Sequence, residues 1–350
     1  MRASYKRHTL NFKRPSGTSR GILTEKETWF LILEENGKFG IGECGLLRGL
    51  SVDDVEDYED KLHWTCNHIS IGAETLYAQL KEYPSIQFGL EQAFVSLESK
   101  NTFELFASPF TSGTNTIPIN GLIWMGDASF MHEQIQQKLS EGFTCIKLKI
   151  GAIDFDKEIE LLESIRKTYS KEDIELRVDA NGAFEPKGAL EKLQILSDYE
   201  LHSIEQPIKP GQHREMKELC KKSPLPIALD EELIGIFDST EKRSLLQAIW
   251  PHYLILKPSL IGGIKGSEEW IALANEYNIG WWVTSALESN IGLNAIAQWT
   301  FTLNNPMPQG LGTGSLFTNN FKCPLIVEEG QLGYRKDIPW ESNLISKLCT

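Results

Sequence analysis

The sequence has no apolar run of the roughly 18 residues that a membrane-spanning helix needs. Its N-terminal stretch is basic but lacks the apolar core of a secretory signal. The six cysteines form no Cys-x-x-Cys pair and no regular framework, a pattern typical of reduced thiols in a cytoplasm. Together these absences predict a soluble, cytoplasmic protein.

Positive charge is also scarce, because 35 lysines and arginines stand against 48 aspartates and glutamates, for a formal net charge of −13. Nucleic acids and anionic membranes are bound through basic patches, so this charge argues against both as partners. A small anionic substrate is compatible with it, because a local pair of lysines can dominate one pocket. No feature of the composition predicts an oligomeric state.

The first third of the chain has a pattern different from that of the rest. Residues 27–35 are β-rich, an Asn-Gly turn follows at 36–38, and residues 39–44 return as a second strand. Two helical stretches come next, one at 51–69 that opens with a serine cap and acidic residues, and one at 85–99. These elements predict an α+β module.

Residues 108–116 are rich in Gly, Ser and Thr and predict a linker. Beyond it, short apolar strands alternate with helices, which predicts a parallel (β/α)7β TIM-like barrel over 116–320. The N-terminal capping domain would span 1–115 and be completed by about 321–350. We expect the residues after 334 to return to it as a strand. A doubly wound sheet is the alternative, but no Gly-rich phosphate-binding turn follows the first strand. The eight candidate strands are residues 118–124, 145–150, 174–180, 202–207, 226–231, 253–259, 280–286 and 307–313.

Five consecutive candidate strands each carry a charged residue near the C-terminal end, namely Lys149, Asp179, Glu205, Asp230 and Lys257. Neighbouring members are about 25 to 30 residues apart, which corresponds to one βα unit. In a parallel barrel such positions meet around one mouth, where the active sites of barrel enzymes lie. The spacing therefore predicts a single site in which lysines flank three carboxylates.

Lys147 lies two residues before Lys149, so in a strand these two side chains point to the same face. Two like charges side by side destabilise a strand unless the site uses them. Three converging carboxylates, at Asp179, Glu205 and Asp230, would also repel one another, and a divalent cation removes that repulsion. Oxygen-only ligands favour Mg²⁺ or Mn²⁺ over Zn²⁺.

A lysine beside another cation has a lowered pKa, so we expect Lys147 to help make Lys149 a usable base. Removing a proton beside a carboxylate forms an enediolate with two negative oxygens, and a bound Mg²⁺ stabilises that charge. The residues thus predict proton abstraction alpha to the carboxylate of a small-molecule substrate, with Mg²⁺ as the cofactor.

The five charged residues lie in the motifs KLK, VDAN, IEQP, LDE and LKPSLIGG, which resemble those of the enolase superfamily, muconate-lactonizing subgroup. The resemblance covers nearly the whole chain and implies a capping domain followed by a (β/α)7β barrel. It implies that the three carboxylates hold Mg²⁺. It also implies that Lys149 takes the proton and that Lys257 acts from the opposite face.

Two further stretches, TSALESNIG at 284–292 and QGLGTGSLF at 309–317, are most similar to those of the subgroup's dehydratases, which act in menaquinone biosynthesis. The resemblance thus implies a hydro-lyase. N-acylamino acid racemases and dipeptide epimerases use the same two lysines on opposite faces of a chiral carbon, and they are the alternative. The epimerases carry an Asp-x-Asp at the eighth strand for a peptide amine, whereas this chain has GLGTGS there.

The same two stretches supply the predicted substrate contacts. Thr284, Ser285 and Ser289 precede a predicted helix and are expected to bind a substrate carboxylate at its N-terminus. Simple helix capping is the alternative for these hydroxyl groups. Gly312 is a further expected substrate contact.

Supporting roles are expected for three more residues. Asn181 lies two residues after Asp179 and would orient a metal ligand, and Glu231 is a weaker candidate for the same role. The loop 42–51 of the capping domain is expected to close over the substrate and to contribute Arg48, although its leucines fit a core position equally well.

Two other classes of protein fit less well. A barrel that binds metal without catalysis would be expected to have lost an acid, a base or a ligand, and all five strand-end positions are intact. A metal-dependent hydrolase would be expected to use histidine ligands, and the strand ends offer none.

Overall fold

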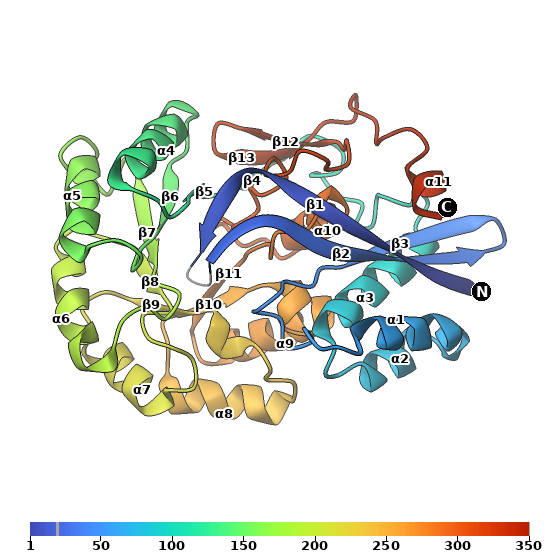
Figure 1. Ribbon diagram of the computed structural model, residues 1–350, viewed down its shortest axis with the longest axis horizontal. Coiled ribbons are helices and arrows are strands. Elements are labelled where there is room, and N and C mark those ends of the chain that lie inside the picture. The colour runs from blue at the N-terminus through green and yellow to red at the C-terminus, as the bar shows by residue number, and fades with distance from the viewer. Residues whose placement is uncertain (19–20, 350) are drawn as a thin grey trace.

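The structure, a computed structural model, describes residues 1–18 and 21–349. An N-terminal sheet with its helices lies beside a ring of parallel strands that is surrounded by helices (Figure 1). No helix in the described part of the chain is both long and apolar enough to cross a membrane.

The N-terminal sheet is antiparallel, with strand order β1-β2-β3. Its central hairpin turns through Asn36 and Gly37, both at positive φ, which is the geometry that an Asn-Gly turn favours. One face of the sheet packs its apolar side chains, including Trp29, Leu31 and Leu33, against the helices that follow. The elements are β1 (Arg2–Thr18), β2 (Gly21–Glu35), β3 (Lys38–Cys44), α1 (Tyr58–Asn67), the 3-10 helix η1 (Ile69–Ile71), α2 (Ala73–Gln79) and α3 (Pro84–Glu98).

The helix predicted at 51–69 is shorter in the structure and begins only at Tyr58. The preceding acidic stretch serves a different helix, because Asp53 Oδ2 accepts hydrogen bonds from the backbone nitrogen and the hydroxyl of Ser85 in the first turn of α3. Ser51 is equally not a helix cap, since its hydroxyl accepts from the backbone nitrogen of Leu47.

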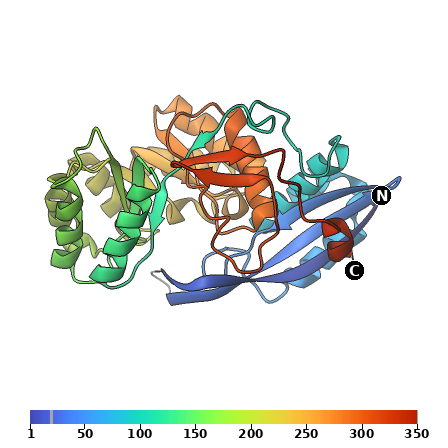
Figure 2. The ribbon, with the colours of Figure 1, turned by 90° about the horizontal axis from the view of Figure 1, so that it is seen from above.

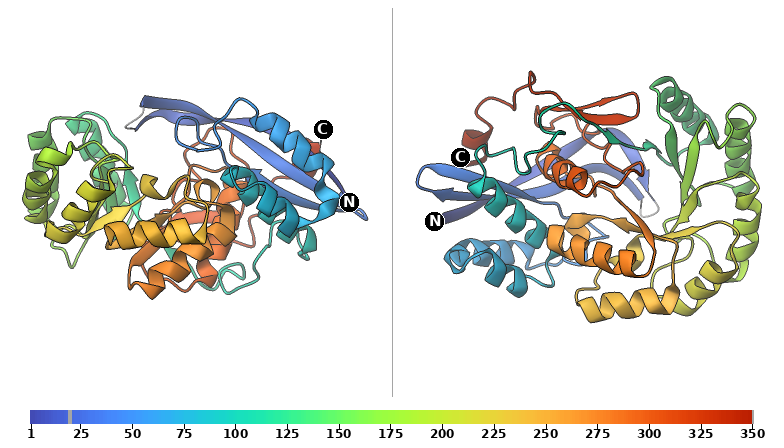
Figure 3. Two further views of the ribbon diagram at one scale, coloured as in Figure 1. Left: turned by 90° about the horizontal axis from the view of Figure 1, so that it is seen from below. Right: turned by 180° about the vertical axis from the view of Figure 1, so that it is seen from behind.

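Seven parallel strands form the barrel in the order β11-β10-β9-β8-β7-β6-β5, and helices follow them on the outside (Figure 3). This confirms the predicted fold class. The elements are β5 (Gly121–Ile123), α4 (Ala128–Ser140), β6 (Cys145–Lys149), α5 (Phe155–Arg166), β7 (Glu175–Asp179), α6 (Pro186–Ser197), β8 (Ser203–Glu205), α7 (His213–Lys222), β9 (Ile227–Leu229), η2 (Glu231–Leu233), α8 (Ser239–Ile249), β10 (Tyr253–Leu256), η3 (Pro258–Leu260), α9 (Gly263–Glu276), β11 (Gly280–Val283) and α10 (Asn290–Thr302).

The eighth predicted strand is present only as two isolated bridges that close the ring. Gln309 pairs with Ile119 on one side, and Gly310 pairs with Thr284 on the other. A Cβ at Gly310 would lie 2.4 Å from the hydroxyl oxygen of Thr284, so a larger residue here would displace the Thr284 side chain.

The C-terminal segment returns to the N-terminal sheet as a helix, so the predicted strand is wrong. The strands β12 (Leu325–Glu328) and β13 (Gln331–Tyr334) form a hairpin that pairs instead with β4 (Ile117–Pro118). The chain then runs to α11 (Leu344–Cys349), which ends beside the N-terminal strands (Figure 2). Two leucines one helical turn apart in α11, Leu344 and Leu348, pack with Phe30 and Ile32 of β2.

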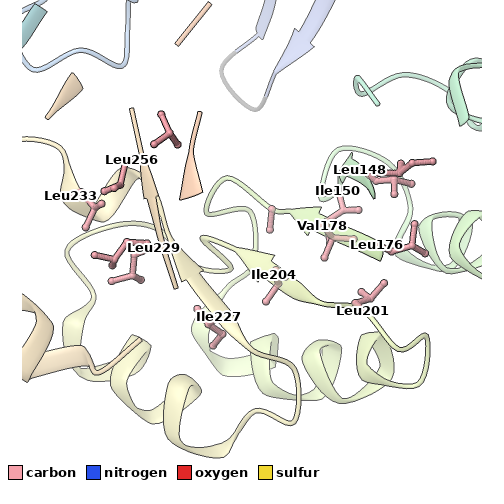
Figure 4. Close-up of a cluster of buried hydrophobic side chains, with 14 of the residues drawn as sticks. Leu148, Ile150, Leu176, Val178, Leu201, Ile204, Ile227, Leu229, Leu233 and Leu256 are labelled. Carbon is pink, nitrogen blue, oxygen red and sulfur yellow. The ribbon is translucent and has the colours of Figure 1, made fainter. Parts of the chain in front are cut away.

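Alternation along the barrel strands separates the core from the site. Leu148, Val178, Ile204, Leu229 and Leu256 belong to the large cluster of buried apolar residues between strands and helices (Figure 4). The residues directly before and after each of these in its own strand therefore face the barrel interior. The lower interior is filled by Ala228, Ile255 and Trp282, with the guanidinium of Arg177 stacked 4.1 Å from the Trp282 ring.

Candidate active site

Strand pairing brings the predicted charged residues together inside the barrel. Lys149 is in register with Asp179, and Asp179 is in register with Glu205. Lys147 lies one inward position below Lys149, as the alternation of a strand requires. Asp230 and Lys257 follow the ends of β9 and β10 directly.

The lysines and carboxylates form one ion-paired network. Lys147 Nζ lies 2.5 Å from Glu205 Oε2 and 3.0 Å from Asp179 Oδ2. Lys149 Nζ lies 2.9 Å from the same Asp179 oxygen. Across the ring, the Lys257 ammonium donates to Asp230 Oδ2. Lys149 thus contacts Asp179 directly, and Lys147 joins Asp179 to Glu205. Asp230 and Lys257 form a separate pair across the ring.

The three carboxylates are buried, with 1–2% of Asp179, Glu205 and Asp230 exposed. Burial and the neighbouring Asp179 raise the pKa of the Glu205 carboxyl well above its ordinary value. Burial also opposes ionisation of Asp179, but the ammonium groups of Lys147 and Lys149 outweigh it and hold the pKa of Asp179 below its usual range. The site therefore concentrates negative charge, and the adjacent ammonium groups keep Asp179 ionised.

The lowered lysine pKa that we expect beside a bound cation is not found for Lys147 and Lys257 in the chain alone. Burial disfavours both ammonium groups, but Asp179 and Glu205 raise the pKa of Lys147 above its ordinary value. Asp230 and Glu205 do the same for the pKa of Lys257. The carboxylates themselves are the reason, since without a further cation they are the lysines' nearest charges.

Within the described residues, no three Asp, Glu, His or Cys side chains come together as a ready-made metal cage. The donor set nevertheless fits a hard cation, because the three buried carboxylates offer only oxygen atoms. Glu205 Oε1 is buried and has no hydrogen-bond partner in the structure. The ammonium of Lys147 between Asp179 and Glu205 shows that this position requires positive charge.

Asn181 and Glu231 extend the network beyond the carboxylates. Asn181 Oδ1 accepts from Lys149 Nζ at 2.6 Å, and its amide donates to Glu231 Oε1 at 2.9 Å. The backbone of Asn181 has a φ of 44°, which asparagine tolerates better than most residues, and its nitrogen donates to Asp179. Asn181 thus links Lys149, which also contacts Asp179, to the carboxylate of Glu231.

A cavity of about 470 Å³ opens above the network. Lys147, Lys149 and Lys257 reach its floor together with Asp179 and Asn181, whereas Glu205, Asp230 and Glu231 are not among its lining residues. The wall is otherwise largely apolar and includes residues of the barrel and of the N-terminal sheet. A concave, mostly apolar space with a few charged groups at its base is typical of a small-molecule site.

Four of the five predicted substrate contacts line the cavity, and one does not. Thr284, Ser285 and Gly312 line the cavity, as does Arg48, whose guanidinium pairs with carboxylates of its own domain. Ser289 is not among the lining residues: its hydroxyl donates to Glu43 at 2.5 Å and accepts from the backbone of Ile291 as the N-cap of α10. These contacts of Ser289 are those of a simple helix cap, which is the alternative to substrate binding.

Sequence reasoning missed the contribution of the β1–β2 hairpin. Lys13 and Leu23 line the cavity, and the hairpin is tied to the barrel because the backbone nitrogen of Lys13 donates to Leu316. Phe12 and Phe317 also form an antiparallel bridge there. The only local signal for this contact was the basic Lys-Arg pair near the hairpin's tip, which by itself is an ordinary surface feature.

Comparison with known proteins places these features in context. The sequence family described as Enolase C-terminal domain-like matches residues 131–336. The chain is 49% identical to an o-succinylbenzoate synthase of Desulfotalea psychrophila, over 95% of this chain and 99% of that protein. It is similar to the crystal structure of MenC from the same organism, with a TM-score of 0.85 and 46% identity over 95% of this chain and 99% of that one.

A more distant solved structure shares the fold alone. It is a dipeptide epimerase from Enterococcus faecalis, complexed with Mg and the dipeptide L-Leu-L-Tyr. Its TM-score is 0.81 at 18% identity, with 95% of this chain and 96% of that chain covered.

Proposed function

The chain belongs to the Enolase C-terminal domain-like family, and from this premise we propose that it is a lyase with the activity of an o-succinylbenzoate synthase. The reaction is the dehydration of 2-succinyl-6-hydroxy-2,4-cyclohexadiene-1-carboxylate to 2-succinylbenzoate in menaquinone biosynthesis. Near-complete coverage at 49% identity to a synthase supports this substrate. The free state of all six cysteines fits a cytoplasmic enzyme.

The charge of the cavity is the observation that carries the substrate class. Its described lining contains one carboxylate, that of Asp179. Against it stand seven cationic side chains, although the whole protein carries a net charge of −13. Four of the seven, Arg48, Lys138, Lys147 and Lys257, also pair with carboxylates that lie outside the lining. Such a cavity suits a substrate with two carboxylates. The cations are Lys13, Arg14, Arg48, Lys138, Lys147, Lys149 and Lys257.

The same observation bears on the epimerase alternative. A dipeptide carries a free amine that needs an acidic partner, and the described lining residues of the eighth-strand segment, such as Gly312 and Thr313, contain no acid. An N-acylamino acid has no free amine, so racemisation of such compounds is the second candidate.

We assign Mg²⁺ to Asp179, Glu205 and Asp230, with Mn²⁺ as an ion of the same preference for oxygen. The oxygen-only donors and the unpartnered Glu205 Oε1 support this assignment. When bound, the ion supplies positive charge that offsets the negative charge growing on the substrate carboxylate during proton removal.

The remaining steps belong to the lysines. Lys149, as a neutral amine, breaks the C–H bond alpha to the ring carboxylate and takes the proton on Nζ. The same Nζ then gives its proton to the departing hydroxyl, so that the C–O bond breaks, water leaves and the ring becomes aromatic. Lys257 directly follows β10, which the strands β7, β8 and β9 separate from β6, and Lys149 ends β6. From this opposite side the Lys257 ammonium stabilises the enediolate.

A steady-state assay of the purified protein tests the proposal through loss of the cyclohexadiene absorbance. We expect turnover with Mg²⁺, loss of turnover after chelation and recovery when Mg²⁺ is returned. Turnover that persists unchanged in excess chelator would remove the metal from the account. No turnover in any condition would move the assignment to N-acylamino acids, tested by exchange of the alpha proton in deuterated water.

A further inference from the structure

One wall of the cavity is held in a strained backbone conformation. Leu287, in the connection between β11 and α10, has a φ of 63°. A leucine rarely adopts this left-handed region, and such residues persist only where surrounding contacts fix them. Its side chain lines the cavity and packs in an apolar cluster with Leu47, Trp124 and Leu316.

The neighbouring residue supplies the contacts that hold this strain. Glu288 is fully buried, and its Oε2 accepts a hydrogen bond from the backbone nitrogen of Ala286 at 2.7 Å. Its Oε1 accepts from the hydroxyl of Ser259 at 2.6 Å. The carboxylate therefore joins the backbone on the far side of Leu287 to η3 of the neighbouring βα connection, and this closes a small loop around the strained residue.

The N-terminal sheet holds the same segment from the opposite side. Glu43 of β3 accepts from the backbone nitrogen of Ser289 at 2.8 Å, from its hydroxyl at 2.5 Å and from the nitrogen of Gly292 at 2.8 Å. Lys26 of β2 is buried, and its ammonium has no hydrogen-bond partner in the described chain. Burial lowers the pKa of Lys26, and the nearby Glu288 and Glu43 oppose this lowering. The cap and the barrel thus meet at two buried carboxylates and one ammonium.

We infer that Glu288 is a positioning residue, which fixes Leu287 so that the leucine side chain forms the apolar wall of the substrate cavity. It touches neither the lysines nor the carboxylates of the proposed site in the structure. Its effect falls on substrate affinity and specificity, not on the proton-transfer steps. This inference rests on the proposed function for its substrate, while its structural part stands independently.

The variant Glu288→Gln keeps the shape of the side chain but has a single accepting oxygen, so it cannot accept both the Ala286 and the Ser259 hydrogen bonds. We expect KM to rise about tenfold with kcat changed less than threefold, because the wall is displaced and the lysines are not. The matched control is Glu91→Gln: Glu91 accepts from the backbone nitrogens of Ile264 and Lys265 at the first turn of α9, away from the cavity. That variant should leave KM unchanged. A wild-type KM in folded Glu288→Gln overturns the inference.

A double-mutant cycle separates positioning from a general loss of structure. Glycine adopts the φ of Leu287 without strain, so Leu287→Gly should raise KM by itself by removing the wall. In that background Glu288→Gln should add no further rise, because there is no side chain left to position. Additive effects of the two substitutions would overturn the inference. If Glu288→Gln does not fold, Ser259→Ala replaces it in the cycle, with the same direction and a smaller rise.

A crystal structure of Glu288→Gln gives a readout that needs no activity. We expect residue 287 to leave the positive φ region. A φ that remains near its present value refutes the positioning role, whatever the substrate is. An inactive wild-type protein, in contrast, refutes the proposed function and leaves this structural result standing.

Discussion

Replacing Lys147 with methionine tests the electrostatic balance of the site. The ammonium of Lys147 lies between Asp179 and Glu205, and only 7% of the residue is exposed. Methionine has a similar length and no charge, so Lys147→Met leaves two buried carboxylates facing each other. Without metal the variant should be destabilised, because removal of one partner of a buried ion pair leaves an uncompensated charge.

The expected loss is about 3 kcal/mol of unfolding free energy, at the lower end of the range for broken buried pairs. The lower end applies because Glu205, whose pKa is already raised, takes up a proton and relieves part of the repulsion. In a chain of this length that corresponds to a fall in Tm of about 4 °C. Saturating Mg²⁺ stabilises any form that binds it, by about 2.7 kcal/mol at one hundred times Kd.

Thermal unfolding of wild type and Lys147→Met, each with excess chelator and with Mg²⁺, measures both effects. We expect the rise in Tm on adding Mg²⁺ to be larger in the variant, because the ion does not compete with an ammonium for the same oxygens. The control is Lys242→Met, since Lys242 is a buried lysine that donates to Glu269 and Gly266 at the α8–α9 contact. Lys242→Met should lower Tm relative to wild type, and this difference in Tm should be the same with chelator and with Mg²⁺. An equal Mg²⁺ effect in wild type and Lys147→Met would refute the reasoning.

Three further outcomes follow from the same structure. Lys149→Ala should lower kcat by about 10²–10⁴-fold with an unchanged circular dichroism spectrum. The control, alanine at the exposed Lys222, should leave kcat unchanged. Near wild-type turnover in Lys149→Ala would remove Lys149 from the chemistry. Asp230→Asn should weaken Mg²⁺ binding in calorimetry, and an unchanged affinity would remove Asp230 from the ligand set. Burial raises the pKa of Asp53 from 3.8 to about 6, so the folded state binds this proton more tightly and stability is lost as pH rises from about 4 to 6. Asp53→Asn mimics the protonated form, so above pH 6 its free energy of unfolding in urea should exceed that of wild type by up to about 3 kcal/mol. At pH 4 the two free energies should be equal. A difference in unfolding free energy that does not vary with pH would contradict this.

The core of the site could be predicted from the sequence because strand geometry is periodic. Lys149, Asp179 and Glu205 occupy equivalent ends of neighbouring strands, and a parallel barrel brings such ends together whatever the loops do. The alternation of β6 in the same way placed Lys147 and Lys149 on one face. These inferences needed only the spacing of polar residues after apolar runs.

Contacts between distant segments could not be predicted in this way. Lys13 lines the cavity because its hairpin docks on the segment around Leu316. The sequences of these two segments do not indicate that they contact each other. Ser289 has the sequence of a helix cap, but its partner Glu43 lies in another domain's strand. The delayed start of α1 has the same origin, because Asp53 is drawn to the first turn of α3.

The most direct test of the central claim is a comparison of two reactions by the wild-type protein with saturating Mg²⁺. One is the dehydration of 2-succinyl-6-hydroxy-2,4-cyclohexadiene-1-carboxylate, and the other is exchange of the alpha proton of N-acylamino acids and dipeptides in deuterated water. We expect kcat/KM for the dehydration to be at least about 100-fold higher, which corresponds to about 2.7 kcal/mol of transition-state discrimination. Faster exchange on an N-acylamino acid or a dipeptide, with slow or absent dehydration, would contradict the assignment as a synthase.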